Sequence, residues 1–221
     1  MSSNTQTGGE KTAYVTILAS DGTFRLVVPT GTPGSILREY ELKDGTKGSK
    51  NELVFQKMTG IIQDVSFFDG SFGRLIQLDI LVNNKVLTLS CSSEQNYGED
   101  IMKKLPNIKL DQVVELSPYA FTDEKGKIKK GMSIVQDGAK VQNFFYDAAT
   151  KAPCNGMPVV PKDKMKKSDW QVYFIGVREF LIEYTEKHFP TKKEKIAKRE
   201  ALDVSSFFTG EEGSAITVDA D

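Results

Sequence analysis

The chain is poor in the residues that build metal centres and nucleophilic active sites. Among its 221 residues are two cysteines and one histidine. Cys91 and Cys154 have no metal-type spacing, and two cysteines make no disulfide framework. His188 has no catalytic partner at a recognisable spacing. These scarcities argue against a zinc site and a Cys–His nucleophile, and they indicate a reducing compartment, for which we expect the cytoplasm.

Motifs for nucleotide or metal chemistry are also missing. The sequence has no GxxxxGK[ST] phosphate loop, no GxGxxG after a strand and no HExxH. Asp64, Asp69 and Asp79 offer carboxylates for a two-metal nuclease site, but Asp79 lies on the polar side of an alternating strand pattern, which favours a solvated face. We therefore expect a non-catalytic protein with no cofactor and no metal. An accessory domain of a nuclease is the weakest of the alternatives.

No apolar run approaches the length of a membrane span. The longest stretches fall well short of 18 residues, so we expect no transmembrane helix and no membrane partner. The polar start of the chain lacks the apolar region of a signal peptide and predicts a disordered leader over residues 1–11. A composition of 39% hydrophobic and 27% charged residues is typical of a globular protein.

The net charge of −1 hides an asymmetry between the body and the end of the chain. Residues 201–221 contain no Lys or Arg and five acidic residues, which leaves the body at a formal +4 (−1 minus −5). A basic body with an acidic end indicates an anionic partner. We expect 201–221 to be a disordered tail that binds partner proteins. Its candidate contacts are Glu211, Glu212, Asp219 and Asp221.

Periodicity predicts a mainly β chain. Residues 12–29 read as a hairpin around Asp21-Gly22, and the following residues to 50 as an extended connection or a second, poorly formed hairpin. Five further strands and one helix are expected, the first strand being bent at Gly60. The strands cover residues 52–68, 74–82, 85–93, 108–121 and 127–141, and the helix lies between the third and the fourth. This order is that of the OB-fold, a five-stranded Greek-key barrel.

The domain organisation follows from this order. The predicted barrel with its N-terminal β extension spans residues 12–142, and the proline-containing stretch 143–167 reads as a linker or loop. A C-terminal helix is predicted over 168–200, because apolar residues recur there at steps of three and four. The apolar stripe, which includes Trp170, Phe174 and Leu181, is expected to pack on the barrel or on a partner.

Aromatic and basic residues alternate where an OB-fold binds its ligand. Single-strand binders combine a basic groove with rings on which bases stack. The candidates lie in the loop after the first barrel strand, at Lys85, in the last hairpin and just after it. They are Phe67, Phe68, Phe72, Arg74, Lys85, Tyr119, Phe121, Lys125, Lys127, Lys129, Lys130, Phe144, Phe145 and Tyr146. The alternatives are core packing for each ring and a solvated turn for the lysines. Tyr119 and Phe121 share a strand face, so we expect either that both rings pack in the core or that both stack on bases of the ligand.

Across roughly residues 12–189 the chain resembles OB-fold single-stranded DNA-binding proteins of tailed bacteriophages. The stretches that carry the resemblance are "FQKMTGIIQDV", "GRLIQLDI", "KVLTLSCSS" and "VVELSPYAF", followed by "KGMSIVQDGAKVQNFF" and an acidic tail. The resemblance implies binding of single-stranded DNA in replication, recombination or repair, in a host cytoplasm. It also implies a tail that recruits replication or recombination proteins or competes with DNA. This tail ends at Asp221 without a terminal Phe.

Three points stay open at the level of sequence. A non-catalytic structural or assembly protein built on a β-barrel is the main alternative function, and it predicts no binding of single-stranded DNA. Self-association through the C-terminal helix is a further expectation, with the number of copies undetermined. The choice between DNA and RNA is also open, because both offer phosphates and stackable bases.

Overall fold

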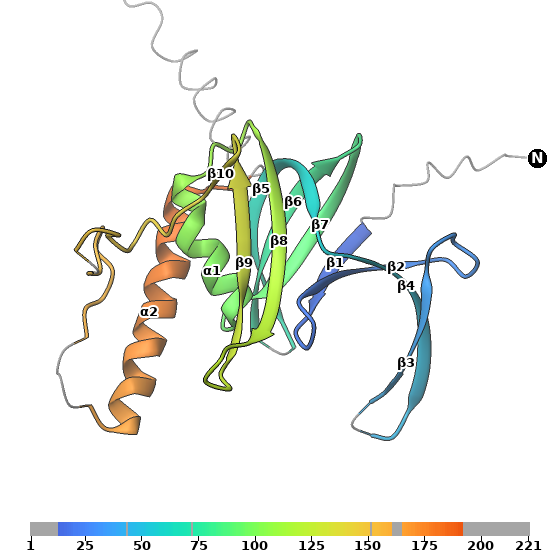
Figure 1. Ribbon diagram of the computed structural model, residues 1–221, viewed down its shortest axis with the longest axis horizontal. Helices are drawn as coiled ribbons and strands as arrows, with labels where there is room; N and C mark the ends of the chain where they lie inside the picture. The colour runs from blue at the N-terminus through green and yellow to red at the C-terminus, as the bar shows by residue number, and fades with distance from the viewer. Residues whose placement is uncertain (1–12, 43, 72, 151, 161–164, 192–221) are drawn as a thin grey trace, which may run out of the picture.

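The computed structural model describes residues 13–42, 44–71, 73–150, 152–160 and 165–191 (Figure 1). These contain ten strands, two α-helices and one 3-10 turn. The strands are β1 Ala13–Leu18, β2 Thr23–Val28, β3 Ile36–Glu41, β4 Lys47–Phe55, β5 Met58–Gly70, β6 Gly73–Val82, β7 Lys85–Ser92, β8 Val113–Thr122, β9 Ile128–Gln136 and β10 Ala139–Lys140. The helices are α1 Asn96–Lys104 and α2 Lys167–His188, with the 3-10 turn Leu105–Asn107 after α1.

All ten strands belong to one mixed sheet that does not close on itself. Its order is β10-β9-β8-β5-β6-β7-β1-β2-β4-β3. Every neighbouring pair is antiparallel except β1 and β7, which are parallel. The chain is therefore mainly β, as the sequence predicts, but the N-terminal strands and the expected barrel strands belong to one sheet.

The predicted five-stranded OB barrel is wrong. A closed barrel leaves no free strand edge, so the third strand of the predicted set, β7, would need a partner from that set on its outer side. In the structure β1 takes that position and pairs with β7 through Ala13, Tyr14 and Val15. The outer edge of β9 pairs with β10 instead. The N-terminal strands thus extend the sheet where closure would have occurred.

The predicted long strand over 52–68 is also divided differently. Residues up to Phe55 belong to β4, which lies between β2 and β3, and β5 starts at Met58. Gly60 lies inside β5 and does not break it. A Cβ at Gly60 would stand 2.5 Å from the carbonyl oxygen of Leu81, so the glycine allows β5 and β6 to approach closely. The irregularity in this strand falls between Ile62 and Asp64.

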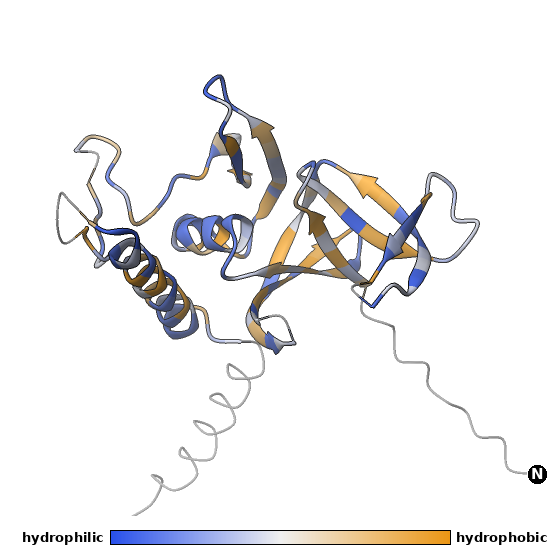
Figure 2. Ribbon diagram, turned by 90° about the horizontal axis from the view of Figure 1, so that it is seen from below, coloured by the Kyte–Doolittle hydropathy of each residue, from blue (hydrophilic) through white to orange (hydrophobic). Residues whose placement is uncertain are grey.

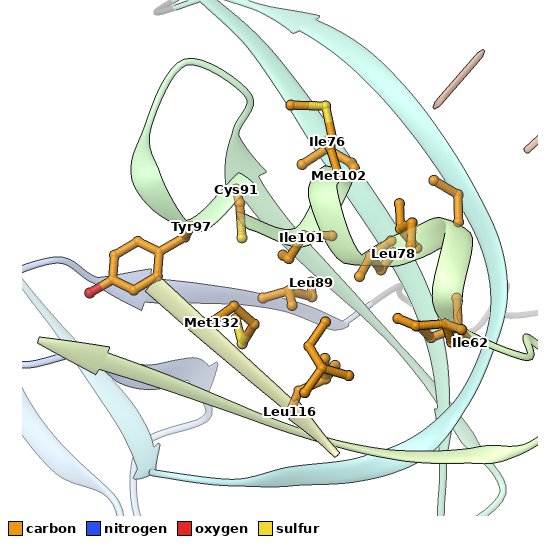
Figure 3. Packing of buried hydrophobic residues seen from close by; sticks show 14 of the residues in the cluster. Ile62, Ile76, Leu78, Leu89, Cys91, Tyr97, Ile101, Met102, Leu116 and Met132 are labelled. Atoms are coloured by element: carbon orange, nitrogen blue, oxygen red, sulfur yellow. The ribbon is translucent and has the colours of Figure 1, made fainter. Parts of the chain in front are cut away.

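The hydrophobic core lies between the sheet and α1. Figure 3 shows side chains from β5, β6, β7, β8 and β9 pointing toward Ile101 and Met102 of α1. In β6 the alternation predicted from the sequence is confirmed, because Ile76, Leu78 and Ile80 are buried whereas the residues between them are only partly buried. Each such side chain contributes about 1.5–3 kcal/mol relative to exposure, so this core fixes which sheet face remains outside.

The predicted C-terminal helix is confirmed as α2, which ends at His188, just before Pro190. Val177, Leu181 and Thr185 are its buried residues, and none lies in its first ten residues. The first turns extend past α1 toward the lower end of the molecule in Figure 1. The part predicted beyond residue 191 lies outside the described residues. Neither helix in the described part of the chain combines the length and apolarity that crossing a membrane requires.

Candidate nucleic-acid interface

The tip of the β8–β9 hairpin is built around Asp123. Its Oδ1 accepts the backbone N–H groups of Lys125 at 3.0 Å and Lys127 at 2.8 Å. The Asp123 N–H donates to the Lys127 carbonyl at 2.8 Å, and Gly126 takes a φ of +74° that favours glycine. An aspartate that holds its own turn in this way fixes the backbone. The lysines of the tip are therefore held on a defined loop with their side chains in solvent.

Tyr119 and Phe121 form an aromatic pair on the outer face of β8. Their ring centroids are 5.9 Å apart, and Phe121 is 56% exposed. Strand alternation sends Leu116 and Pro118 inward, which places both rings outside. The sequence left open whether the two rings lie in the core or on the outer face of the strand, and the structure places them on the outer face.

Two adjoining pockets join this pair to the lysines. One, of about 510 Å3, is lined by Tyr119, Phe121, Asp123, Lys129, Ser133 and Lys140. The other, of about 600 Å3, is lined by Phe121, Thr122, Asp123, Glu124, Lys125, Lys127 and Lys129. We call the two together the hairpin groove. Its lining carries four lysines and two carboxylates, a formal charge of +2.

The lysines of the hairpin groove are weakly engaged within the protein. Lys129 Nζ lies 3.9 Å from Asp123 Oδ2, a distance at the limit of an ion pair. Within the described part of the chain, Lys125 and Lys127 have no ion pair. Lys130, also predicted, lies on the opposite face of β9 from Lys129. Three exposed ammonium groups (those of Lys125, Lys127 and Lys129) thus surround the aromatic pair.

The position of Tyr119 is set by three residues that were not among the predicted site residues. Tyr97 of α1 donates its hydroxyl to the Tyr119 carbonyl at 3.3 Å. Gly22, in the β1–β2 turn, lies against the backbone of Tyr119 and Ala120. At Gly131 a Cβ would stand 2.4 Å from the Tyr119 hydroxyl, so the glycine leaves room for the ring. Burial, aided by the charge of Asp100, raises the pKa of Tyr119, so its hydroxyl stays protonated in neutral solution.

Replacing Gly22 by alanine should destabilise the protein more than replacing Gly126. Both have positive φ, +65° and +74°, so both substitutions strain the backbone by about 1 kcal/mol. Only at Gly22 would the new Cβ meet backbone, 2.5 Å from Ala120 N, whereas nothing lies within 4 Å of it at Gly126. Urea unfolding of the two variants measures the difference. Equal losses would show that the β1–β2 turn does not support β8.

Residues predicted around the β5–β6 turn serve packing against α2. The Arg74 guanidinium lies over the Phe67 ring at 5.0 Å and pairs with Glu186 of α2, and its Nε lies 3.6 Å from Asp69 Oδ1. Phe68 is 55% exposed. Phe72 lies outside the described residues. The β5–β6 turn was expected beside the β8–β9 hairpin because both loops flank the binding face of an OB barrel. The sheet is not a closed barrel, so this expectation no longer applies.

The aromatic run after β9 is divided between packing and solvent. Phe145 is buried, with its ring 4.9 Å from Tyr184 and 5.4 Å from Phe180 of α2. Phe144 is half-buried in the same cluster, and Tyr146 is exposed. Lys85 is exposed at the turn between β6 and β7. The predicted contacts of the acidic tail lie outside the described residues.

Lys140 and Ser133 complete the groove and were not predicted. Ser133 faces Ser117 across the β8–β9 ladder, and Lys140 pairs with Val135 because β10 folds back on β9. The signal in the sequence was the Asp137-Gly138 turn, which is typical of a two-residue hairpin. In the described part of the chain, no three His, Cys, Asp or Glu side chains group so that they could hold a metal ion.

Comparison of the chain with protein-family models finds no match, and the same holds for comparison with curated proteins and with solved structures.

Proposed function

We propose that the protein binds single-stranded DNA without sequence preference, as a non-catalytic protein of replication, recombination or repair in the cytoplasm. The observation that supports this most is the hairpin groove, where the exposed Phe121 ring and the half-buried Tyr119 ring lie among lysines with weak or no ion pairs. The resemblance in sequence to phage single-strand binders agrees with the proposal. The acidic tail, as a site for partner proteins or as a competitor for the groove, remains a proposal from sequence.

The chemistry of the groove matches that of a flexible anionic strand. Bases have a π-face whatever their identity, so stacking on Phe121 and Tyr119 needs no particular sequence. Lysine is a point charge that pairs with a phosphate without fixed geometry, which suits a backbone of variable path. Binding then releases counterions, so affinity falls as salt rises. A duplex presents its bases stacked inside, which leaves the exposed rings without a partner.

Titrating fluorescently labelled oligo-dT with the full chain at two salt concentrations tests the proposal. We expect binding at low salt that weakens at high salt, and weaker binding of duplex. Absence of binding at low salt would reject the proposed function and favour a structural or assembly role.

Phe121→Ala should weaken oligo-dT binding by about fivefold to 100-fold, because one base loses its stacking partner. Phe68→Ala is the matched control, since Phe68 is equally exposed but lies on β5, outside the hairpin groove. Anisotropy titrations of both variants, with circular dichroism to check folding, decide the matter. An effect of Phe68→Ala as large as that of Phe121→Ala would remove the special role of the groove.

A further inference from the structure

A second pair of exposed rings lies on the first turns of α2. Trp170 and Phe174 are stacked, with centroids 5.7 Å apart and an interplanar angle of 26°. Trp170 is 37% exposed and Phe174 is 48% exposed, although large apolar rings are usually covered. Tyr173 lies beside them and donates its hydroxyl to the Pro158 carbonyl at 3.1 Å, which fixes this side of the cluster.

The pair continues the buried stripe of α2 beyond the region that covers it. Phe174 and Val177 follow Trp170 at steps of four and three, so with 3.6 residues per turn they share one face with Leu181. Val177 and Leu181 are buried, whereas the two rings lie where α2 extends past α1 (Figure 1). The packing predicted for the stripe thus covers Val177 and Leu181 but leaves Trp170 and Phe174 partly exposed.

Two positively charged residues of α2 adjoin the rings. Lys167 precedes Trp170 by three residues, and Arg178 follows Phe174 by four, so both adjoin the pair. The Nε of Arg178 is buried and has no hydrogen-bond acceptor in the described structure. Glu179 lies nine residues, about two and a half turns, after Trp170 and therefore on the opposite side. Asp169 is engaged at the helix start, where its Oδ2 accepts the Lys166 N–H at 3.1 Å.

We propose that Trp170 and Phe174 form a second stacking platform for the same single-stranded DNA, with Lys167 and Arg178 contacting phosphates. This rests on the proposed function. The first turns of α2 and the tip of the β8–β9 hairpin lie at the same end of the molecule, the lower end in Figure 1 and the side facing the viewer in Figure 2. Both surfaces are therefore presented at one end of the molecule, as contact with a single strand requires. Charge complementarity selects a polyanion over a second copy of the chain, which would bring like charges together at its own Lys167 and Arg178.

The chain offers a direct probe, because Trp170 is its only tryptophan. Addition of unlabelled oligo-dT should quench its emission, and the quenching should saturate at the same protein-to-oligo ratio as the anisotropy of a labelled oligo. Trp170→Ala should weaken binding by about fivefold or more, with Trp170→Phe closer to the wild type because a ring remains. Val172→Ala, exposed on the other side of the same helix, should leave quenching and affinity unchanged.

The readouts separate this inference from the proposed function. Binding seen by anisotropy without any change in Trp170 emission, and with full affinity in Trp170→Ala, would overturn the second platform and leave the hairpin groove intact. Absence of binding by both readouts would overturn both proposals. A blue shift of Trp170 emission that follows protein concentration without oligo would also overturn the platform, and it would assign this face to contact between copies.

Discussion

Reversing the charge of Lys127 and Lys129 together should lower the affinity for oligo-dT by about 100-fold at low salt. Both side chains are exposed and line the hairpin groove beside Phe121. Each lysine–phosphate contact that is lost forfeits counterion release worth about fivefold at 0.1 M salt, and a glutamate in its place adds repulsion. The expected loss should shrink as salt rises, because exposed charges are screened. Anisotropy titration of the double variant measures it.

A matched variant separates the groove from the overall charge. Lys47→Glu with Lys187→Glu makes the same change in net charge at two exposed lysines of β4 and α2. We expect it to weaken binding only a few-fold, through the general field of the protein. If the two double variants lose affinity equally, the groove has no special part in binding.

Replacing Glu52 by alanine should lower the free energy of unfolding by about 3 kcal/mol. The Glu52 side chain is fully buried in β4 and is the partner of two cations, Arg38 and Lys50. Arg38 makes a two-pronged contact, Nε to Oε2 at 2.8 Å and Nη2 to Oε1 at 3.0 Å, and Lys50 Nζ lies 3.0 Å from Oε1. Arg25 Nη1 lies 3.9 Å from Glu52 Oε2. Without the carboxylate, Arg38 and Lys50 lose their shared partner at the β2–β4–β3 end of the sheet, whereas Arg25 keeps its pair with Asp21 at 2.7 Å.

Urea unfolding checks this, with Glu41→Ala as the control. Glu41 is an exposed carboxylate on β3, 3.8 Å from Lys47 Nζ, and such surface pairs contribute well under 1 kcal/mol. If Glu52→Ala unfolds at the same urea concentration as Glu41→Ala, the buried cluster does not stabilise the N-terminal strands.

The same cluster predicts a dependence on pH. Hydrogen bonds from Arg38, followed by those from Lys50, lower the pKa of Glu52 below its ordinary value. A carboxyl with a lowered pKa stabilises the fold fully above its unfolded pKa of about 4.3, and this contribution is lost as pH falls below that value. The stability gap between the wild type and Glu52→Gln should therefore be widest at neutral pH and narrow in acid. A gap that widens in acid would contradict this.

Local structure was largely predictable from the sequence, because it depends on neighbouring residues. The alternation in β6, the Asp21-Gly22 turn and the stripe of α2 each follow from a period or a turn preference. For the residues that form β3 and the start of β4, the sequence was compatible with either an extended connection or a second hairpin, and the structure has the hairpin.

The closure of the sheet was not predictable in this way, since it depends on which strand reaches a given edge first. β1 and β7 pair across more than 70 residues of chain, and no local pattern marks that choice. The error over 52–68 has the same origin, because Glu52 and Phe55 are β-like in sequence whether they extend β5 or pair with β2.

In the candidate site, too, contacts between residues close in sequence were predicted and contacts between distant residues were not. Tyr119, Phe121 and the hairpin lysines were found because they lie near each other in the chain. Lys140 joins them through the fold of β10, and Gly22 supports them from the β1–β2 turn. Arg74 and Phe145 were expected to face a ligand, but α2 covers them from residues more than 30 positions away.

The dependence of affinity on salt, compared between the wild type and Lys127→Gln with Lys129→Gln, tests the central claim most directly. For a single strand, the slope of log affinity against log salt is about −0.7 for each phosphate contact. If the hairpin lysines contact phosphates, the neutral double variant should bind more weakly with a slope shallower by about 1.4. An unchanged slope would contradict the claim that the β8–β9 hairpin is a binding site for single-stranded DNA.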